Sequence, residues 1–285
     1  MSAPDVLMVG GGVIGCAVAR HAALGGARVV LLERGRPGEE ASWAAAGMLA
    51  PLVEADGPGP FLDLLLRGRE VFPGFAAALR EETGIDVGYS DAGTLSLALT
   101  DADEREMERR HAWQSEVGLP VERLTEEEAR ALEPALTPAV RCALRFPGDH
   151  QVENRELARA LHQAALRAGV EVRGGAGVES VTICGGRAAG VRLESGEYVA
   201  AGGVVVAAGC WAGGLRGLPR PLPILPVHGQ LAAMEVLPQR FRHCLDTPRC
   251  YLVPRAGGRL IAGATVERGV WRKAVTPAGV CGILA

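Results

Sequence analysis

The stretch DVLMVGGGVIGCAVARHAALGGARVVLLERG, residues 5–35, decides the fold. Its apolar run at residues 6–9 predicts a short buried strand of a parallel sheet. Small apolar residues at helical spacing follow Gly15 and predict a helix, which a Gly-Gly pair ends. A second apolar run at residues 27–33 predicts another buried strand, which closes on an acidic residue. This order of strand, glycine-rich turn, helix and strand is typical of a parallel α/β domain.

The turn carries a dinucleotide-binding motif, because Gly10, Gly12 and Gly15 form G-x-G-x-x-G between the predicted strand and helix. Gly10 permits the tight turn, Gly12 lets a pyrophosphate approach the backbone, and Gly15 lets the helix pack closely on the strand. The helix N-terminus then offers free N–H groups to the phosphates. Glu33 lies about 20 residues beyond the motif, where a carboxylate accepts ribose hydroxyls and repels a 2′-phosphate. We therefore expect a dinucleotide other than NADP. The alternative is a glycine-rich turn without a ligand.

The next stretch, RPGEEASWAAAGMLAP at residues 36–51, has two interpretations. Its alanines are typical of a surface helix chosen for helix propensity. The same small residues, Ala44 to Gly47, would also let a flat ring system lie against the backbone, and Ser42 could reach a phosphate.

Four segments together resemble the glycine oxidases of thiamine biosynthesis, a group within the D-amino acid oxidase family of flavoproteins. The segments are GGGVIG, LLERG, ASWAAAGMLAP and, later, CYLVPR-x-x-GRLIAGATVE. The resemblance implies FAD rather than NAD as the cofactor. It also implies that Val178 contacts the adenine through its backbone, and that the glycine-rich turn from Gly209 lies near the cofactor. The other residues that it places along the cofactor are Gly10, Gly12, Ile14, Gly15, Glu33, Arg34, Ser42, Ala46, Gly47 and Met48.

The α/β pattern returns after residue 147, so we expect a discontinuous Rossmann-like, glutathione-reductase-like FAD-binding domain at residues 1–52 and 147–217. Residues 53–146 and 218–285 are expected to form an inserted α+β substrate domain. Its mixed sheet would contain LPVHGQLAAMEV, CYLVPR and RLIAGAT.

Local signals add detail to this division. They predict a helix at residues 61–71 with a second helix to Glu82, a capping box between Thr125 and Glu128, and Asn154 as a helix N-cap.

The resemblance implies oxidation of glycine, sarcosine and small D-amino acids to a 2-oxo acid, ammonia and hydrogen peroxide, with oxygen as co-substrate. Tyr251 matches the tyrosine that helps to bind the substrate carboxylate, although a half-buried strand tyrosine is the alternative. Met48 would limit the size of the substrate pocket. We leave the role of His228 open and expect no catalytic role for His150 or His162.

The family's carboxylate-binding arginine lies beyond the helix that TPAGVCGILA, residues 276–285, begins. From the resemblance we therefore expect a chain that lacks the family's C-terminal segment. Arg255 or Arg268 could substitute as the anchor, with Arg255 expected to point to solvent. Two other functions stay open, namely a quinone-linked D-amino acid dehydrogenase and an inactive FAD-binding fragment.

Composition excludes several other classes. A chain of 285 residues with 39 glycines and few aromatic residues fits an α/β enzyme better than a helical bundle. The formal net charge of −3 gives no reason to expect nucleic acid or an anionic membrane as a partner. Seven scattered cysteines without a C-x-x-C predict free thiols, no metal site and a cytoplasmic protein. The sequence leaves a homo-oligomer open.

Overall fold

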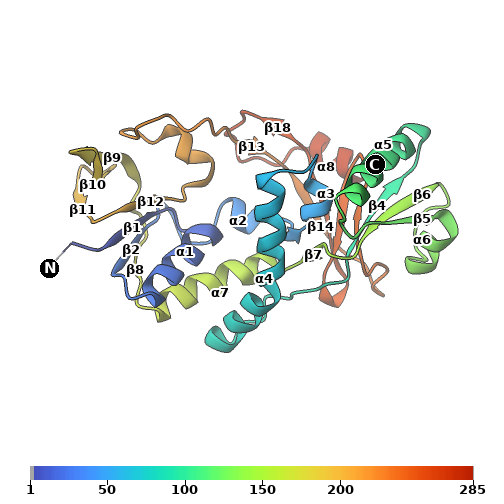
Figure 1. Cartoon of the computed structure of the whole chain (residues 1–285), viewed down its shortest axis with the longest axis horizontal. Coiled ribbons are helices and arrows are strands. Elements are labelled where there is room, and N and C mark those ends of the chain that lie inside the picture. The colour runs from blue at the N-terminus through green and yellow to red at the C-terminus, as the bar shows by residue number, and fades with distance from the viewer. Residues whose placement is uncertain (1–2, 285) are drawn as a thin grey trace.

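The computed structural model describes residues 3–284 (Figure 1). A four-stranded parallel sheet lies near the N-terminus, with its strands in the order β12-β1-β2-β8. Its strands are β1 (Val6–Val9), β2 (Val29–Leu32), β8 (Glu171–Arg173) and β12 (Val204–Val206). Helix α1 (Val13–Leu24) connects β1 to β2, as the opening motif predicts. The predicted strand, turn, helix and strand are confirmed.

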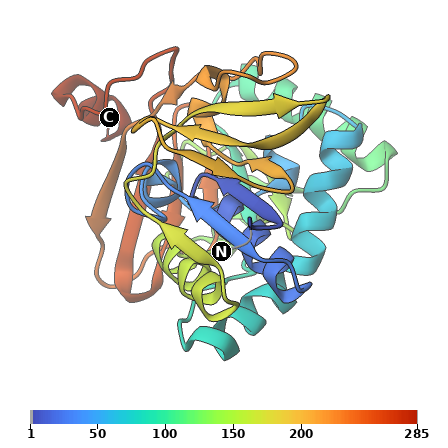
Figure 2. The same ribbon diagram turned by 90° about the vertical axis from the view of Figure 1, so that its left-hand side faces the viewer.

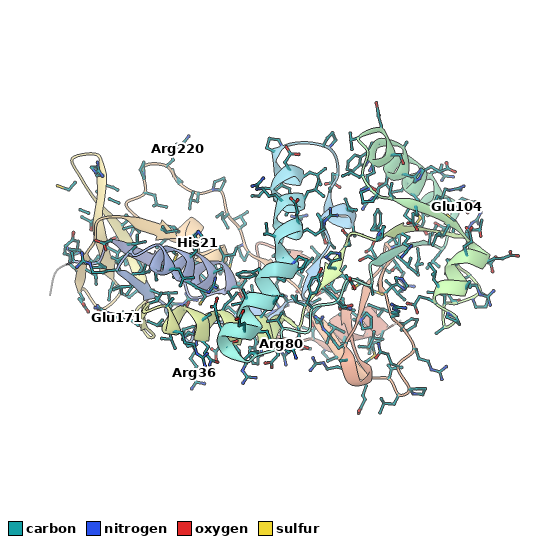
Figure 3. The ribbon with its side chains drawn as sticks, turned by 60° about the horizontal axis from the view of Figure 1, so that its bottom comes forward. His21, Arg36, Arg80, Glu104, Glu171 and Arg220 are labelled. Carbon is teal, nitrogen blue, oxygen red and sulfur yellow. The ribbon has the colours of Figure 1, made fainter. Side chains whose placement is uncertain are left out.

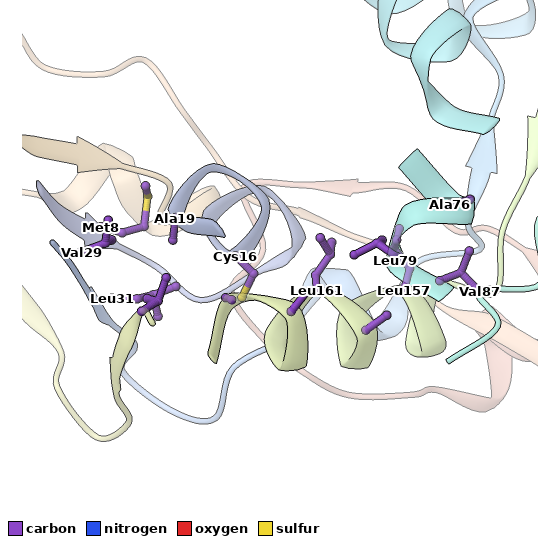
Figure 4. Packing of buried hydrophobic residues seen from close by; sticks show 14 of the residues in the cluster. Met8, Cys16, Ala19, Val29, Leu31, Ala76, Leu79, Val87, Leu157 and Leu161 are labelled. Carbon is purple, nitrogen blue, oxygen red and sulfur yellow. The ribbon is translucent and has the colours of Figure 1, made fainter. Parts of the chain in front are cut away.

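Both faces of this sheet are covered, which explains why its strands are apolar without alternation. Met8 and Leu31 pack on one face against α1 and α7 (Asn154–Arg167), in a core that reaches Leu79 (Figure 4). Leu7 and Leu32 pack on the other face against a three-stranded antiparallel sheet. That sheet consists of β9 (Val178–Cys184), β10 (Arg187–Leu193) and β11 (Tyr198–Ala200), and Figure 2 shows it stacked over the parallel strands.

The second large sheet has seven strands in the order β14-β17-β16-β15-β4-β6-β5. They are β4 (Thr94–Ala98), β5 (Glu122–Thr125), β6 (Cys142–Phe146), β14 (Leu231–Glu235), β15 (Cys244–Asp246), β16 (Tyr251–Pro254) and β17 (Arg259–Gly263). β15 and β4 run parallel, whereas the other neighbours run antiparallel. The predicted mixed sheet is confirmed.

Two helices bury the two faces of the β4–β6 end of this sheet. Met107 of α5 (Asp101–Glu116) packs with Leu144 and Phe146 of one face. Ala129 of α6 (Glu126–Leu132) packs with Leu95 of the other face. The predicted capping box at the start of α6 is present, with Thr125 Oγ1 accepting from Glu128 N at 3.3 Å and Glu128 Oε2 accepting from Thr125 N at 2.8 Å.

Two of the predicted helix details are wrong. Residues 60–83 form one helix, α4 (Pro60–Thr83), with Pro73 inside it, because packing holds it on both sides of the proline: Leu66 packs with Leu52 and Val53, and Leu79 packs in the core below the parallel sheet. At α7 the N-cap position belongs to Glu153. Asn154 lies inside the helix, where its amide donates to the carbonyls of Ser42 and Trp43, each at 2.9 Å.

The remaining elements are short, and α2 lies near the centre of Figure 1, between the two sheets. They are α2 (Ala41–Ala44), β3 (Met48–Leu49), α3 (Pro51–Glu54), β7 (His150–Gln151), the 3₁₀ helices η1 (Gly209–Gly214) and η2 (Ala256–Gly258), β13 (Val227–His228), β18 (Glu267–Arg268) and α8 (Pro277–Leu284). The domain boundaries at residues 52, 147 and 217 stay a prediction.

The surface carries charges of both signs, as Figure 3 shows for Arg36, Arg80, Glu171 and Arg220. Within residues 3–284, no helix is long and apolar enough to cross a membrane. In the same part of the chain, no group of three or more His, Cys, Asp or Glu side chains could hold a metal ion.

Candidate active site

A cavity of about 790 Å³ opens where β1 meets α1, and we call it the first cavity. Its volume lies in the range of about 300–1,000 Å³ that is common for ligand sites. The wall includes most of the predicted cofactor residues, namely Gly10, Gly12, Ile14, Glu33, Arg34, Ser42, Val178 and Gly209. The fold therefore brings residues from the N-terminal motif, β9 and η1 together around one hollow.

The glycines shape this cavity through close backbone contacts. Gly10 has a φ of +106°, which favours glycine, and a Cβ there would collide with the carbonyl of Ala207. A Cβ at Gly15 would collide with the carbonyl of Gly10, which shows how closely α1 packs on the turn. A Cβ at Gly12 would meet Ser42 Oγ at 3.1 Å, at the rim of the helix N-terminus. The contacts of Gly10 and Gly15 fit the predicted tight turn and the close packing of the helix, whereas contact between Gly12 and a pyrophosphate stays a prediction.

Glu33 is fixed from two sides by backbone donors. Its Oε2 accepts from Gly11 N at 2.7 Å, and its Oε1 accepts from Gly35 N at 2.8 Å. Each carboxylate oxygen keeps a further lone pair. The side chain lines the first cavity, so it is oriented to accept hydroxyl groups of a sugar.

Ser42 caps α1 from outside the helix. Its Oγ accepts from Val13 N at 3.1 Å, and its own proton is free to be donated into the cavity. The first turn of α1 holds no acidic residue to offset the positive end of the helix dipole. This arrangement suits a phosphate, and the 70% exposed Ile14 beside it offers apolar surface to a flat group. The residues present thus fit a dinucleotide.

A second cavity of about 1,000 Å³ adjoins the first one. Its floor is the mixed sheet, through Leu231, Ala233, Tyr251 and Ile261 of β14, β16 and β17. Six residues line both cavities, and we call them the neck: Glu39, Glu40, Ala41, Ala45, Cys210 and Trp211.

The neck is held by rings and charges. The Arg34 guanidinium lies 4.3 Å from the ring centroid of Trp211. On the Trp211 ring the Trp271 ring also packs, with 6.0 Å between the two centroids. Lys273, which lines the second cavity, forms an ion pair with Glu40 of the neck. A long ligand could therefore run from the parallel sheet to the mixed sheet between side chains that are already placed.

Tyr251 lies on the floor of the second cavity, on the face of the sheet that its partner Gly263 shares. A Cβ at Gly263 would lie 2.7 Å from both Cζ and Oη of Tyr251, so the ring occupies space that only glycine leaves open. Burial, with a smaller contribution from the charge of Glu54, raises the pKa of Tyr251. Its hydroxyl therefore remains a proton donor at neutral pH.

Three predicted cofactor residues, Ala46, Gly47 and Met48, line neither cavity. Ala46 is buried, and Gly47 and Met48 are half-buried. Their neighbours Ala44 and Ala45 are exposed and line the second cavity. Contact between residues 46–48 and a cofactor stays a prediction.

The expectation that Arg255 points to solvent is wrong. The residue is buried, because its guanidinium turns inward to the carbonyl of Ala46 and to Gln151 Oε1. Arg268 is exposed on β18 and is not among the residues that line the second cavity in the described part of the chain. The cations that do line it are already engaged: Arg259 with Glu153, Lys273 with Glu40, Arg272 with Glu267, and Arg155 over the Trp43 ring.

The histidines differ in their surroundings. His228 lines the second cavity, and its Nδ1 lies 2.6 Å from Glu267 Oε2. His150 lies on β7, where its Nδ1 is 2.7 Å from the Tyr89 hydroxyl. Burial lowers the pKa of both His150 and His162.

Sequence reasoning missed Asp149, which is fully buried beside α3. Its two carboxylate oxygens accept from Leu52 N at 3.0 Å and from Val53 N at 3.1 Å. Burial raises the pKa of Asp149 to about 7, although the two backbone hydrogen bonds favour its charged form. The residue fixes the start of α3, close behind the alanine-rich segment.

Comparison with known proteins agrees with this geometry. The family model for FAD dependent oxidoreductases, DAO, matches residues 5–285. This chain belongs to the DAO family of FAD-dependent oxidoreductases. FAD is thus its cofactor, and the resemblance to glycine oxidases is confirmed.

Individual relatives give the same result. A glycine oxidase from Geobacillus kaustophilus is 36% identical over 285 residues, which cover 98% of this chain and 74% of the relative. The crystal structure of the glycine oxidase from that organism superposes with a TM-score of 0.92, covering 100% of this chain and 77% of the other. The bifunctional protein ThiO/ThiG of Synechocystis sp. is 36% identical over 97% of this chain, which spans 40% of that relative.

Proposed function

We propose that this protein catalyses the FAD-dependent oxidative deamination of glycine, with sarcosine and small D-amino acids as further substrates. In the proposed reaction glycine, oxygen and water give glyoxylate, ammonia and hydrogen peroxide. One observation carries the proposal: the dinucleotide cavity and the cavity of Tyr251 meet at a shared neck. A cofactor as long as FAD, with its ribose at Glu33, could present its ring to the second cavity through that neck.

The first cavity supplies the binding of the nucleotide half. Gly10 and Gly12 leave room for a pyrophosphate at the N-terminus of α1, and the Ser42 hydroxyl can donate to it. Glu33 can accept the ribose hydroxyls, because Gly11 and Gly35 already fix its carboxylate. When bound, FAD supplies the acceptor for the hydride that leaves the substrate α-carbon.

The second cavity supplies orientation of the substrate. Tyr251 can donate its hydroxyl proton to the substrate carboxylate, because its raised pKa keeps it protonated. Met48 and Tyr251 pack against the same small cluster of Ala46, Cys244 and Val253, which ties the size of this cavity to the alanine-rich segment. Leu231 and Ile261 of the floor offer an apolar surface to the reacting carbon.

The further proposal that the reaction serves thiamine biosynthesis rests on the sequence resemblance alone. We also propose a cytoplasmic location, which the free, scattered cysteines support.

The test begins with FAD binding. The purified 285-residue chain is incubated with FAD, desalted and scanned for visible absorbance. We expect a retained flavin band. We then expect glycine to bleach this band without air, and to release peroxide in air in proportion to the glycine consumed. Sarcosine and D-alanine should do the same, whereas a bulky amino acid such as D-tryptophan should not.

Each other outcome changes the proposal in a defined way. Bleaching by glycine without peroxide release, followed by transfer of electrons to a quinone, would favour a quinone-linked dehydrogenase. A retained flavin that glycine does not bleach would contradict the proposed substrate and leave an FAD-binding fragment. A colourless protein would contradict the whole proposal.

A further inference from the structure

Arg255 joins the mixed sheet to the alanine-rich segment from a buried position. The residue follows β16 and is 6% exposed. Its Nη2 donates to the carbonyl of Ala46, and its Nη1 donates to Gln151 Oε1 at 3.0 Å. One guanidinium thus connects residues that are more than 200 positions apart in the sequence. A planar fork with several donors can make two such bonds at once, whereas an ammonium group cannot make them in the same geometry.

The backbone beside Arg255 is shaped to accept it. Gly47 has a φ of +72°, and a Cβ there would lie 2.8 Å from Arg255 Nη2 and would collide with the carbonyl of Val152. The Gly47 carbonyl accepts from Val152 N at 2.9 Å. Met48 then pairs with Gln151, the same residue whose side chain Arg255 holds. Residues 46–48 are therefore fixed by backbone and side-chain bonds together.

The segment that Arg255 holds is continuous with the wall of the second cavity. Ala44 and Ala45 are exposed to that cavity and directly precede the carbonyl that Arg255 binds. If this carbonyl were released, the backbone at residues 44–47 could rotate, and an unpaired C=O could turn toward the cavity. The bond therefore keeps the Ala46 carbonyl in a buried position, directly behind the residues that line the cavity.

Stability alone is a weak reason for this arrangement. A buried cation loses its hydration, and its attraction to a nearby acid often does no more than offset that cost. The nearest acid, Glu153, lies 3.8 Å from Arg255 Nε, which makes no hydrogen bond of its own. The Glu153 carboxylate is bound more closely by Arg259.

We propose that Arg255 is a positioning residue: by binding the Ala46 carbonyl it fixes the preceding residues Ala44 and Ala45, which form the wall on which the flavin ring lies. The inference rests on the proposed function, since it assumes that FAD occupies the second cavity through the neck. Arg255 acts through the Ala46 carbonyl and does not touch the substrate.

The experiment compares three variants of the full chain. Arg255→Met removes the donors but keeps a long apolar side chain. Arg255→Lys keeps the charge but loses the fork. Arg145→Met is the matched control, because it removes an arginine of the same sheet that pairs with Glu122 and lines neither cavity. The readouts are the Kd for FAD by quenching of flavin fluorescence, the visible circular dichroism of the bound flavin, and thermal unfolding of the FAD-free chain.

We expect the FAD Kd to rise roughly 10- to 100-fold in Arg255→Met, with altered visible circular dichroism, and less in Arg255→Lys. Arg145→Met should stay within about twofold of the unaltered chain with an unchanged spectrum. Should Arg255→Met fail to fold, the circular dichroism of Arg255→Lys decides. Wild-type affinity and spectrum in both Arg255 variants would overturn the inference while leaving the proposed function intact. An unaltered chain that binds no FAD would overturn both.

Discussion

The two cavities are built in different ways. The phosphate end of the first is made mainly by backbone, through glycines and N–H groups that one stretch of 31 residues brings together. The second is made by side chains from separate segments of the chain, which meet only when the mixed sheet is complete. A site made by local backbone is readable from sequence and intolerant of added atoms. A site made by distant side chains is invisible to local patterns and should tolerate conservative substitutions at a modest cost.

The largest expected effect is that of Gly15→Ala in the first cavity. The new methyl group would collide with the Gly10 carbonyl, so the turn or the helix must move. We expect FAD binding at least about 100-fold weaker and unfolding free energy lower by about 3 kcal/mol. Fluorescence titration and urea unfolding measure the two quantities.

The matched control for this substitution is Gly68→Ala in α4, where an added Cβ meets nothing within 4 Å. It should stabilise the chain by about 1 kcal/mol through helix propensity and leave FAD binding unchanged. If Gly15→Ala and Gly68→Ala show the same FAD affinity and the same unfolding free energy, the first cavity tolerates added atoms and does not differ from the second in this respect.

The distance in sequence between contacting residues also explains which features could be predicted from the sequence. The parallel strands, α1 and the roles of Gly10 and Glu33 follow from one contiguous pattern whose physics is short-range. The mixed sheet and Tyr251 came from the resemblance, since no local pattern reveals that β15 pairs with β4, about 150 residues away. Arg255 was misplaced because an arginine after a strand usually reaches water, and only the fold shows the Ala46 carbonyl beside it. Asp149 gave no signal, because its partners Leu52 and Val53 lie nearly 100 residues earlier.

Asp149 lies at the junction of the two regions and predicts a pH effect on stability. Its pKa is about 7 in the folded chain against an ordinary value of 3.8, so the folded state holds the proton more tightly. The stabilisation is complete below about pH 4 and is lost as the pH rises through about 7. We expect urea unfolding to show a fall on the order of a few kcal/mol between about pH 5 and about pH 8, which Asp149→Asn should remove.

The control for this effect is Asp5, whose pKa is lowered to about 2 by its hydrogen bonds with Arg28. Its contribution is lost only as the pH falls below the ordinary range of aspartate, so Asp5→Asn should not alter the change between pH 5 and 8. An unchanged pH profile in Asp149→Asn would show that the buried carboxylate stays charged on its two backbone donors.

Glu33→Gln tests whether the fixed carboxylate of Glu33 binds the ribose hydroxyls in the first cavity. A glutamine keeps one oxygen but turns an NH₂ group toward one of the two backbone donors, which leaves that donor unpaired. We expect the FAD Kd to rise about tenfold. The control Glu39→Gln changes a residue of the neck that lines both cavities, and it should leave the Kd within about twofold. Equal effects of the two variants would show that the net charge of the wall matters and not the position of Glu33.

The smallest expected effect belongs to Tyr251→Phe in the second cavity. The ring keeps its place over Gly263, and only the hydroxyl that would bind the substrate carboxylate is lost. We expect KM for glycine to rise about 5- to 10-fold with kcat nearly unchanged, because one hydrogen bond contributes about 1 kcal/mol. Tyr198→Phe is the matched control, since that hydroxyl donates to the Ala189 carbonyl on the three-stranded sheet, away from both cavities. If steady-state kinetics show the same KM in both variants, Tyr251 is a half-buried strand tyrosine and the second cavity must hold the carboxylate by another group. If KM rises only in Tyr251→Phe, distant side chains do orient the substrate, each with a modest share of the binding energy.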